Sequence, residues 1–104
     1  MLRSLGQRPV AGGDEDLTVA GLRAAVSRLR RELAAYPAEF PDRAIAEDEL
    51  AALAAMTIDG TPEIPCLRRS LLLIAGAIGS MSALAPWLSE VRRAVDLFGE
   101  PPRR

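Results

Sequence analysis

Histidine, lysine and asparagine are absent from the sequence, and cysteine and tryptophan occur once each. Histidine is the commonest general base in enzymes and the commonest metal ligand, so its absence removes the usual routes to both kinds of site. A single cysteine excludes an internal disulfide and any zinc site that needs two thiolates. We therefore expect no catalytic residues, no metal site and no cofactor, and we expect that the protein is not an enzyme.

Alanine and leucine are abundant, with 18 and 15 residues in a chain of 104. This length is that of one small domain, and an apolar fraction of 49% is enough for one hydrophobic core. All 13 basic residues are arginine, against 14 acidic residues, for a net charge of −1. Exclusive use of arginine is typical of a GC-rich genome, and proteins that follow phosphates usually have a basic excess that is missing here.

The two ends of the chain differ from its middle. Residues 1–15 mix glycine, proline and charges of both signs without an apolar period, and they predict a disordered tail. Residues 100–104 contain two prolines and predict a frayed C-terminus, so residues 16–99 are expected to form a single helical domain. No apolar run of signal-peptide length is present near the start, which with the lone cysteine favours the cytoplasm.

Two helices are predicted in the first half of the chain. The first begins near Asp16 or Thr18, either of which can cap it, and ends before Pro37. The second has Asp42 as its N-cap and runs to about Asp59. Their apolar residues recur every three or four positions, as on one face of a helix: Val19, Leu22, Val26, Leu29, Leu33 and Tyr36 in the first helix, and Ala46, Leu50, Leu53 and either Met56 or Thr57 in the second.

A third helical region is predicted to begin with Thr61 as its N-cap. Its apolar residues follow the same spacing: Leu67, Leu71, Ile74, Ile78, Met81, Leu84, Leu88, Val91, Val95 and Phe98. One residue is missing from this period between Met81 and Leu88, and Pro86 lies in the same interval. A phase slip beside a proline predicts a kink or break around residues 82–86.

These elements predict an all-α fold, a helical hairpin packed on a long third helix that is kinked or split near Pro86, which makes a bundle of three or four helices. Without a break, a helix over residues 64–98 would be about 52 Å long, against about 28 Å for the first helix. Part of its apolar row would then lack cover, so we take this row as a candidate interaction surface: Leu84, Leu88, Val91, Val95 and Phe98. A break would instead fold the row back into a compact four-helix monomer.

The stretch Ser70–Leu88 carries no charge over 19 residues, close to the length of about 20 residues that spans a membrane. Small residues recur in it every four positions, at Ala75, Gly79 and Ala83 and at Gly76 and Ser80. Because the apolar row continues past this stretch, we interpret it as the central helix of a bundle, with its small residues packed on the alanine-rich second helix. Insertion of residues 70–88 into a membrane is the alternative.

Neither the charged residues nor the cysteine predicts a catalytic or ligand-binding site. In an antiparallel hairpin, Arg28–Arg31 would lie near Glu47–Glu49 as a solvated face. A nucleic acid that used the arginines would meet these acidic residues, so nucleic-acid association is a weak third alternative. Cys66 has no histidine or lysine to act as its base, and we interpret it as a buried or half-buried small side chain.

Two stretches of the chain resemble small uncharacterised actinobacterial proteins, a family whose domain has no known function. They are LRAAVSRLRRELAAYPAEFPDRAIAEDELAAL and LLLIAGAIGSMSALAPWLSEVRRAVDLFG, and the similarity covers most of residues 17–99. The resemblance implies an actinobacterial origin and an all-helical fold, without an activity or site residues. In organisation the chain is also similar to helical accessory proteins encoded beside bacterial conflict-system effectors.

Taken together, the heptad spacing and the missing catalytic residue types favour a non-enzymatic protein–protein interaction or accessory module. Its expected partner is another protein or a second copy of the chain.

Overall fold

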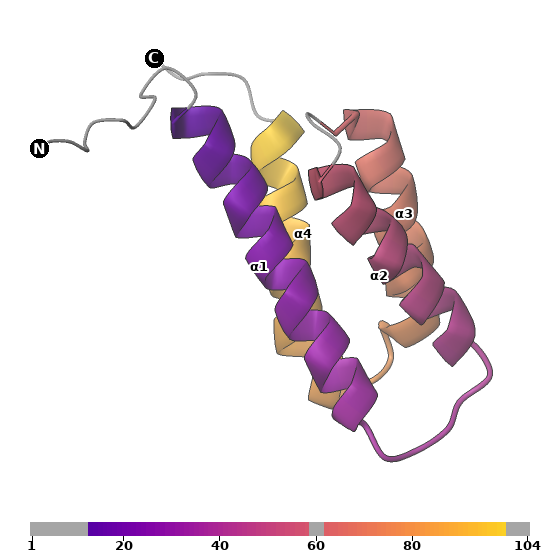
Figure 1. The fold of residues 1–104 in the computed structure, drawn as a ribbon. Coiled ribbons are helices and arrows are strands. Elements are labelled where there is room, and N and C mark those ends of the chain that lie inside the picture. Colours follow the sequence, from indigo (N-terminus) through magenta and orange to yellow (C-terminus); the bar gives the residue numbers. More distant parts are fainter. Residues whose placement is uncertain (1–12, 59–61, 100–104) are drawn as a thin grey trace, which may run out of the picture.

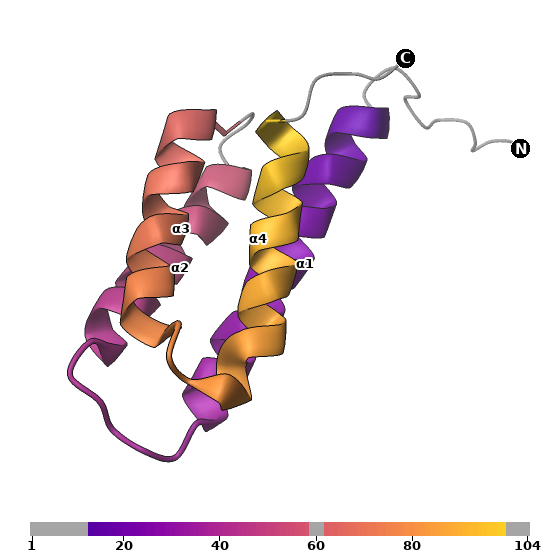
Figure 2. The same cartoon turned by 180° about the vertical axis from the view of Figure 1, so that it is seen from behind.

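The fold is known from a computed structural model, which describes residues 13–58 and 62–99, with side chains described for residues 17–58 and 62–98. These residues form four α-helices, one 3-10 helix and no strand: α1 (Gly13–Ala35), α2 (Arg43–Ile58), α3 (Ile64–Ile78), η3 (Ser82–Leu84) and α4 (Ala85–Gly99). The predicted all-α fold is therefore confirmed. Each helix runs antiparallel to its two neighbours, with α1 between α2 and α4, and α3 beside both α2 and α4 (Figures 1 and 2).

The core lies between the four helices and is built by the apolar rows. Buried positions include Leu22 and Leu29 of α1 and Leu50 and Leu53 of α2, each 0% exposed. Thr57 is 3% exposed and Met56 is only partly buried, which settles the last position of the α2 row. The periodicity of these two helices therefore predicted their buried faces correctly.

The third helical region is split into α3 and α4. Helix α3 ends at Ile78, where the N–H of Met81 donates to the Ile78 carbonyl at 2.9 Å, and Met81 itself is extended, with φ −93° and ψ 101°. The break thus begins before residue 82 and not at Pro86. Pro86 lies in the first turn of α4, where a missing N–H costs no intrahelical hydrogen bond.

Several boundaries differ from those predicted. Helix α1 begins at Gly13, so residues 13–15 belong to the helix and not to a tail, while residues 1–12 and 100–104 lie outside the described residues. Helix α3 has Glu63 as its N-cap, and Thr61 also lies outside the described residues. A helix capped two residues earlier would need the N–H that Pro65 lacks, whereas a start at Glu63 places this proline in the first turn.

Arg43, the first residue of α2, closes the C-terminal end of α1. Its Nη1 donates to the carbonyl of Leu33 at 2.9 Å, and its Nη2 donates to the carbonyls of Tyr36 at 2.6 Å and Ala38 at 2.9 Å. Its side chain is 14% exposed, and its guanidinium carbon lies 5.2 Å from the centre of the Phe40 ring. Helix ends leave carbonyls without intrahelical donors, and this guanidinium supplies donors to one carbonyl of the last turn of α1 and to two in the loop after it.

The loop between α1 and α2 is held from both sides. The rings of Tyr36 and Phe40 pack edge to face with centroids 5.8 Å apart, and both are partly buried against the core. Phe40 therefore covers the end of the hairpin. Among the described residues, the ion pairs are made by Arg43, with Glu39 and Glu47, each at 3.6 Å. The segments Arg28–Arg31 and Glu47–Glu49 were predicted to lie near each other, and Arg30 and Glu47 do line one hollow, although the ion pairs of the described residues do not join the two segments.

Two further polar contacts link neighbouring helices. The Nη2 of Arg23 in α1 donates to the carbonyl of Thr57 at the end of α2, at 2.9 Å. The Ser70 hydroxyl of α3 donates to Oε1 of Glu49 in α2, at 2.9 Å, and Ser70 is 4% exposed. The buried hydroxyl is thereby satisfied, which avoids the cost of an unpaired polar group.

The small residues of α3 do not form the predicted contact with α2. The buried side of α3 consists of Leu67, Ser70, Ile74, Ala77 and Ile78. Of the predicted small-residue stripes, Ala75 is partly buried against the core, whereas Gly76, Gly79, Ser80 and Ala83 are exposed, and a Cβ added at Gly76 would meet no atom within 4 Å. The four-residue spacing of small side chains was therefore wrongly interpreted as a packing face, since the larger apolar side chains turn toward the core instead.

Replacement of Arg43 tests its role at the end of α1. We expect Arg43→Ala to lower the free energy of unfolding by about 2–4 kcal/mol, because three carbonyls lose a charged donor. Arg43→Lys should recover only part of this, since an ammonium cannot reproduce the fork of donors. Urea unfolding followed by circular dichroism measures both, with the exposed Arg31→Ala as a control expected to change stability by less than about 0.5 kcal/mol. Equal effects of Arg43→Ala and Arg31→Ala would contradict the assignment.

The two glycines at the end of α3 should respond oppositely to alanine. A Cβ at Gly79 would collide with the carbonyl oxygen of Ala75, a main-chain atom that cannot move aside, whereas Gly76 has open space. We expect Gly76→Ala to stabilise the protein by about 0.5–1 kcal/mol and Gly79→Ala to destabilise it by about 1–3 kcal/mol. Thermal and urea unfolding of the two variants make the comparison, and stabilisation by Gly79→Ala would refute the described turn.

Candidate interaction groove between α1 and α4

The row that we predicted as an interaction surface is buried inside the chain. Leu84 is 2% exposed, Leu88 7%, and Val91 and Val95 are 0% exposed, while Phe98 is partly buried against the same core. The physical reason is the break after Ile78, which turns α4 back along α1, so that the bundle itself covers the row. These residues are therefore corrected from surface to core.

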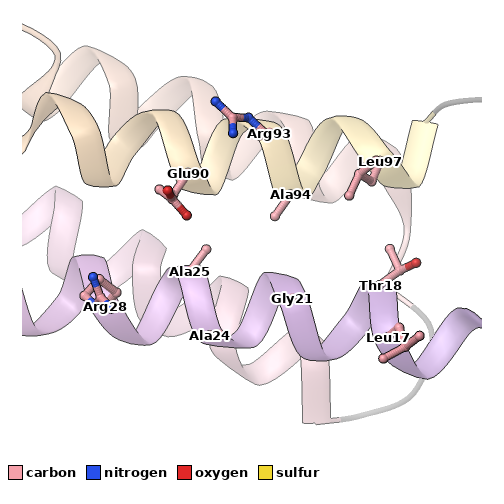
Figure 3. Close-up of a pocket in the computed structure, with 10 residues that line it drawn as sticks. All are labelled: Leu17, Thr18, Gly21, Ala24, Ala25, Arg28, Glu90, Arg93, Ala94 and Leu97. Atoms are coloured by element: carbon pink, nitrogen blue, oxygen red, sulfur yellow. The ribbon is translucent and has the colours of Figure 1, made fainter.

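A groove runs instead along the outer side of the α1–α4 pair. Its floor is made of small residues, Gly21, Ala24 and Ala25 from α1 and Ala94 from α4, and it encloses about 360 Å³. Figure 3 shows Ala25 and Ala94 directed toward each other across the space between the two helices. The space stays open because glycine and alanine side chains are too small to fill it.

One end of the groove is apolar. Leu17 of α1 and Leu97 of α4 lie there, and their side chains are 71% and 57% exposed. Both leucines line the groove and are among the large apolar side chains that the described residues leave in solvent.

The other end of the groove is charged. It is lined by Arg28 of α1 and by Glu90 and Arg93 of α4. Figure 3 shows Glu90 on the side of α4 that faces α1 and Arg93 on its opposite side. The guanidinium carbon of Arg28 lies 4.9 Å from the centre of the Trp87 ring, a cation–π contact that joins the two helices. Arg28, one of the arginines in the segment Arg28–Arg31, thus makes a contact within the fold.

Sequence reasoning missed this groove, although a signal for it was present. Leu17 and Leu97 are large apolar residues that fall outside the apolar rows of their helices. Once each row is assigned to the core, a leucine left outside the row is a candidate for an exposed contact. The groove itself could not be predicted from the sequence, because it depends on which helix packs beside α1.

Other exposed features are more scattered. Leu72 and Leu73 of α3 are 72% and 42% exposed, and Ile45 of α2 is 45% exposed. A second, smaller hollow of about 260 Å³ lies between α1 and α2, lined by Arg30, Leu33, Ala34, Glu47 and Leu50. None of these places combines a groove with two large exposed apolar side chains at its end, as the α1–α4 groove does.

Cys66 is exposed, which corrects the prediction of a buried or half-buried side chain. It lies in the first turn of α3, where its thiol donates to Oε1 of Glu63 at 3.9 Å. Within the part of the chain that the structure describes, no group of three or more cysteine, aspartate or glutamate side chains is arranged to hold a metal ion.

The uncharged stretch 70–88 is not one helix. Helix α3 ends at Ile78 and α4 begins at Ala85, so the chain turns inside the stretch. Over residues 13–58 and 62–99, the structure contains no helix with both the length and the apolar character to cross a membrane.

The described helices define a class of protein, a small antiparallel bundle of α-helices. The chain belongs to the DUF5955 family, a family of unknown function whose model matches residues 11–99. This confirms the uncharacterised family that the resemblance implied, while the actinobacterial origin stays a prediction. No curated protein and no solved structure matches the chain.

A charged substitution tests whether the row from Leu84 to Phe98 lies in the core. We expect Val91→Asp to destabilise the protein by about 3 kcal/mol or more, because it buries a carboxylate without a partner. Ser89→Asp adds the same charge at an exposed position two residues earlier and should change stability by less than about 0.5 kcal/mol. Thermal unfolding by circular dichroism compares them. A Val91→Asp variant that melts at the wild-type temperature would contradict the assignment of this row to the core.

Proposed function

We propose that this protein is a non-enzymatic interaction module that binds a helix of a protein partner in the α1–α4 groove. The observation that carries the proposal is the pair Leu17 and Leu97, both more than half exposed, at the end of a groove with a floor of small residues. Apolar side chains that a bundle leaves in solvent beside a groove are typical of a surface that another protein covers.

The shape of the groove favours a helix as the bound element. Two antiparallel helices with glycine and alanine along their shared edge allow the axis of a third helix to approach closely, at about 8–10 Å. Leucines at the rim can then pack between side chains of the incoming helix, as in helix-in-groove recognition. The charged end, with Arg28, Glu90 and Arg93, supplies polar contacts that orient the bound helix.

A small molecule fits this groove less well. Gly21 and Ala24 in its floor are exposed, and a Cβ added at Gly21 would meet no atom within 4 Å. Small-molecule sites bury most of the ligand surface, about 70–90%, which an open groove between two helices cannot do.

The remaining parts of the proposal concern chemistry and compartment. A binding role is consistent with a sequence that has neither histidine nor lysine to act as a general base. We place the protein in the cytoplasm, because its single cysteine, Cys66, has an exposed and unpaired thiol of the kind that a reducing compartment preserves.

Site-specific photo-crosslinking in living cells tests the proposal. A photo-reactive amino acid at Ala24, in the groove, should join the protein to a discrete partner that mass spectrometry identifies. The same amino acid at Ala51, an exposed alanine of α2, is the matched control and should give no such product. We expect that Ala24→Trp, which fills the groove, then weakens binding of the purified partner at least about tenfold in calorimetry.

The absence of any crosslinked partner at Ala24 would refute the proposed function. Equal crosslinking from Ala24 and Ala51 would also refute it, because contact would then not depend on the groove.

A further inference from the structure

We infer that residues 5–10 of this chain occupy the α1–α4 groove when no partner is bound, so that a partner has to displace them. This inference rests on the proposed function and names the regulation of that same site. The segment has the sequence LGQRPV and precedes the described residues.

The chain enters the fold at the apolar end of the groove. Helix α1 begins at Gly13, about one turn before the exposed Leu17, and Leu17 lines the groove together with Leu97. Residues 5–10 are therefore joined to this end through the two residues before Gly13. So short a tether holds a segment at an effective concentration of about millimolar, and even weak contacts then keep it in the groove for much of the time.

The length of the segment matches that of the groove. Leu17 and Arg28 line the groove at its two ends and are 11 positions apart on α1, which corresponds to a rise of about 17 Å. Residues 5–10 also span about 17 Å when they are extended. Pro9 favours this conformation, because its ring fixes its own φ and disfavours the helical region for the preceding Arg8.

A reversal of the chain between α1 and the segment brings apolar side chains together. Gly12 lies at the point of reversal and, without a Cβ, can adopt the left-handed conformations that tight turns use. The segment then runs antiparallel to α1, so that Val10 packs against Leu17 and Leu97. These leucines are 71% and 57% exposed, and their burial favours docking.

The floor of the groove admits an extended backbone. Gly21, Ala24, Ala25 and Ala94 carry no side chain larger than a methyl group. A Cβ added at Gly21 would meet no atom within 4 Å, so the space above this part of the floor is open. The main chain of the segment can therefore approach both helices closely.

The charge that α4 directs toward α1 is negative. Figure 3 shows Glu90 on the side of α4 that faces α1 and Arg93 on the opposite side. The guanidinium carbon of Arg28 lies 4.9 Å from the centre of the Trp87 ring, so this cation is held at the edge of an aromatic contact. A segment with a positive charge and no acid therefore suits the groove.

The register places the arginine of the segment near this carboxylate. Arg8 lies about 7 Å along an extended chain from Val10, and Glu90 lies about 10 Å along α4 from Leu97. With Val10 packed at Leu97, an arginine side chain is long enough to cover the difference.

Residues 100–104 suit the groove less well, although they follow α4 at the same end. They consist of one glutamate, two prolines and two arginines, after α4 ends at Gly99. They contain no large apolar side chain that could cover Leu17 and Leu97. Residues 5–10 contain two, Leu5 and Val10.

Photo-crosslinking of the purified full-length chain tests this contact. A photo-reactive amino acid at Ala24, with the chain at about 10 μM, should form a crosslink to residues 5–10 at monomer mass, since the tethered segment is far more concentrated than other chains. Mass spectrometry of the digested product locates the crosslink. The double variant Leu5→Asp with Val10→Asp should lower its yield at least about fivefold, because carboxylates replace the apolar contacts and are repelled by Glu90.

Matched controls separate docking of the segment from added charge. Leu2→Asp with Ser4→Asp adds the same two charges outside residues 5–10 and should keep most of the crosslink. The photo-reactive amino acid at Ala51, an exposed position of α2, should give no crosslink to the segment. Circular dichroism should show the same helix content in every variant.

The same variants test the regulation in cells. With the photo-reactive amino acid at Ala24, the Leu5→Asp/Val10→Asp chain should give at least about twofold more partner product than the chain with the native segment. The reason is that the apparent affinity of a site falls in proportion to the fraction of molecules in which the site is free.

The outcomes separate this inference from the proposed function. A purified chain that gives no crosslink from Ala24 to residues 5–10 overturns the inference, and so does a crosslink between two chains at twice the monomer mass. If a partner is still crosslinked in cells, the proposed function stands without the segment. A crosslink to the segment without partner product from either chain refutes the proposed function instead. A partner yield that does not change when the intramolecular crosslink is lost overturns the competition.

Discussion

The contact between Arg43 and the end of α1 determines how the rest of the bundle is arranged. A helix that stops at Ala35 leaves carbonyls without donors, and the guanidinium at the start of α2 donates to the carbonyl of Leu33 and to two carbonyls of the following loop. This contact holds the start of α2 beside the C-terminal end of α1, and burial of the two apolar faces sets α2 antiparallel to α1. The apolar faces of the two helices then meet along their whole length.

A second guanidinium repeats this arrangement at the opposite end of the hairpin. Arg23 of α1 donates to the last turn of α2, so each helix of the pair closes the C-terminus of the other. Together the two contacts oppose both sliding and separation of α1 and α2. The hairpin offers two more sides, and α3 and α4 occupy them because the turn after Ile78 reverses the chain.

The surface left by this arrangement explains where binding is proposed. The four helices absorb the apolar rows, including the part of α4 that an unbroken helix would have left uncovered. The large apolar side chains that stay in solvent are those outside the rows, and Leu17 and Leu97 line the same groove because α1 and α4 are antiparallel neighbours. A groove between them follows from the glycine and alanines that the same two helices place between the rows.

The sequence by itself determined the helices, their buried faces and the presence of a kink or break near Pro86, without deciding between the two. Helical periodicity is a local property, so residues such as Leu29, Leu53 and Ile74 could be assigned to the core without knowledge of their neighbours. Only the tertiary structure decided which carbonyls Arg43 reaches, that the small residues of α3 face solvent, and that the row from Leu84 to Phe98 is covered. These features depend on which helices lie side by side, and no local pattern contains that information.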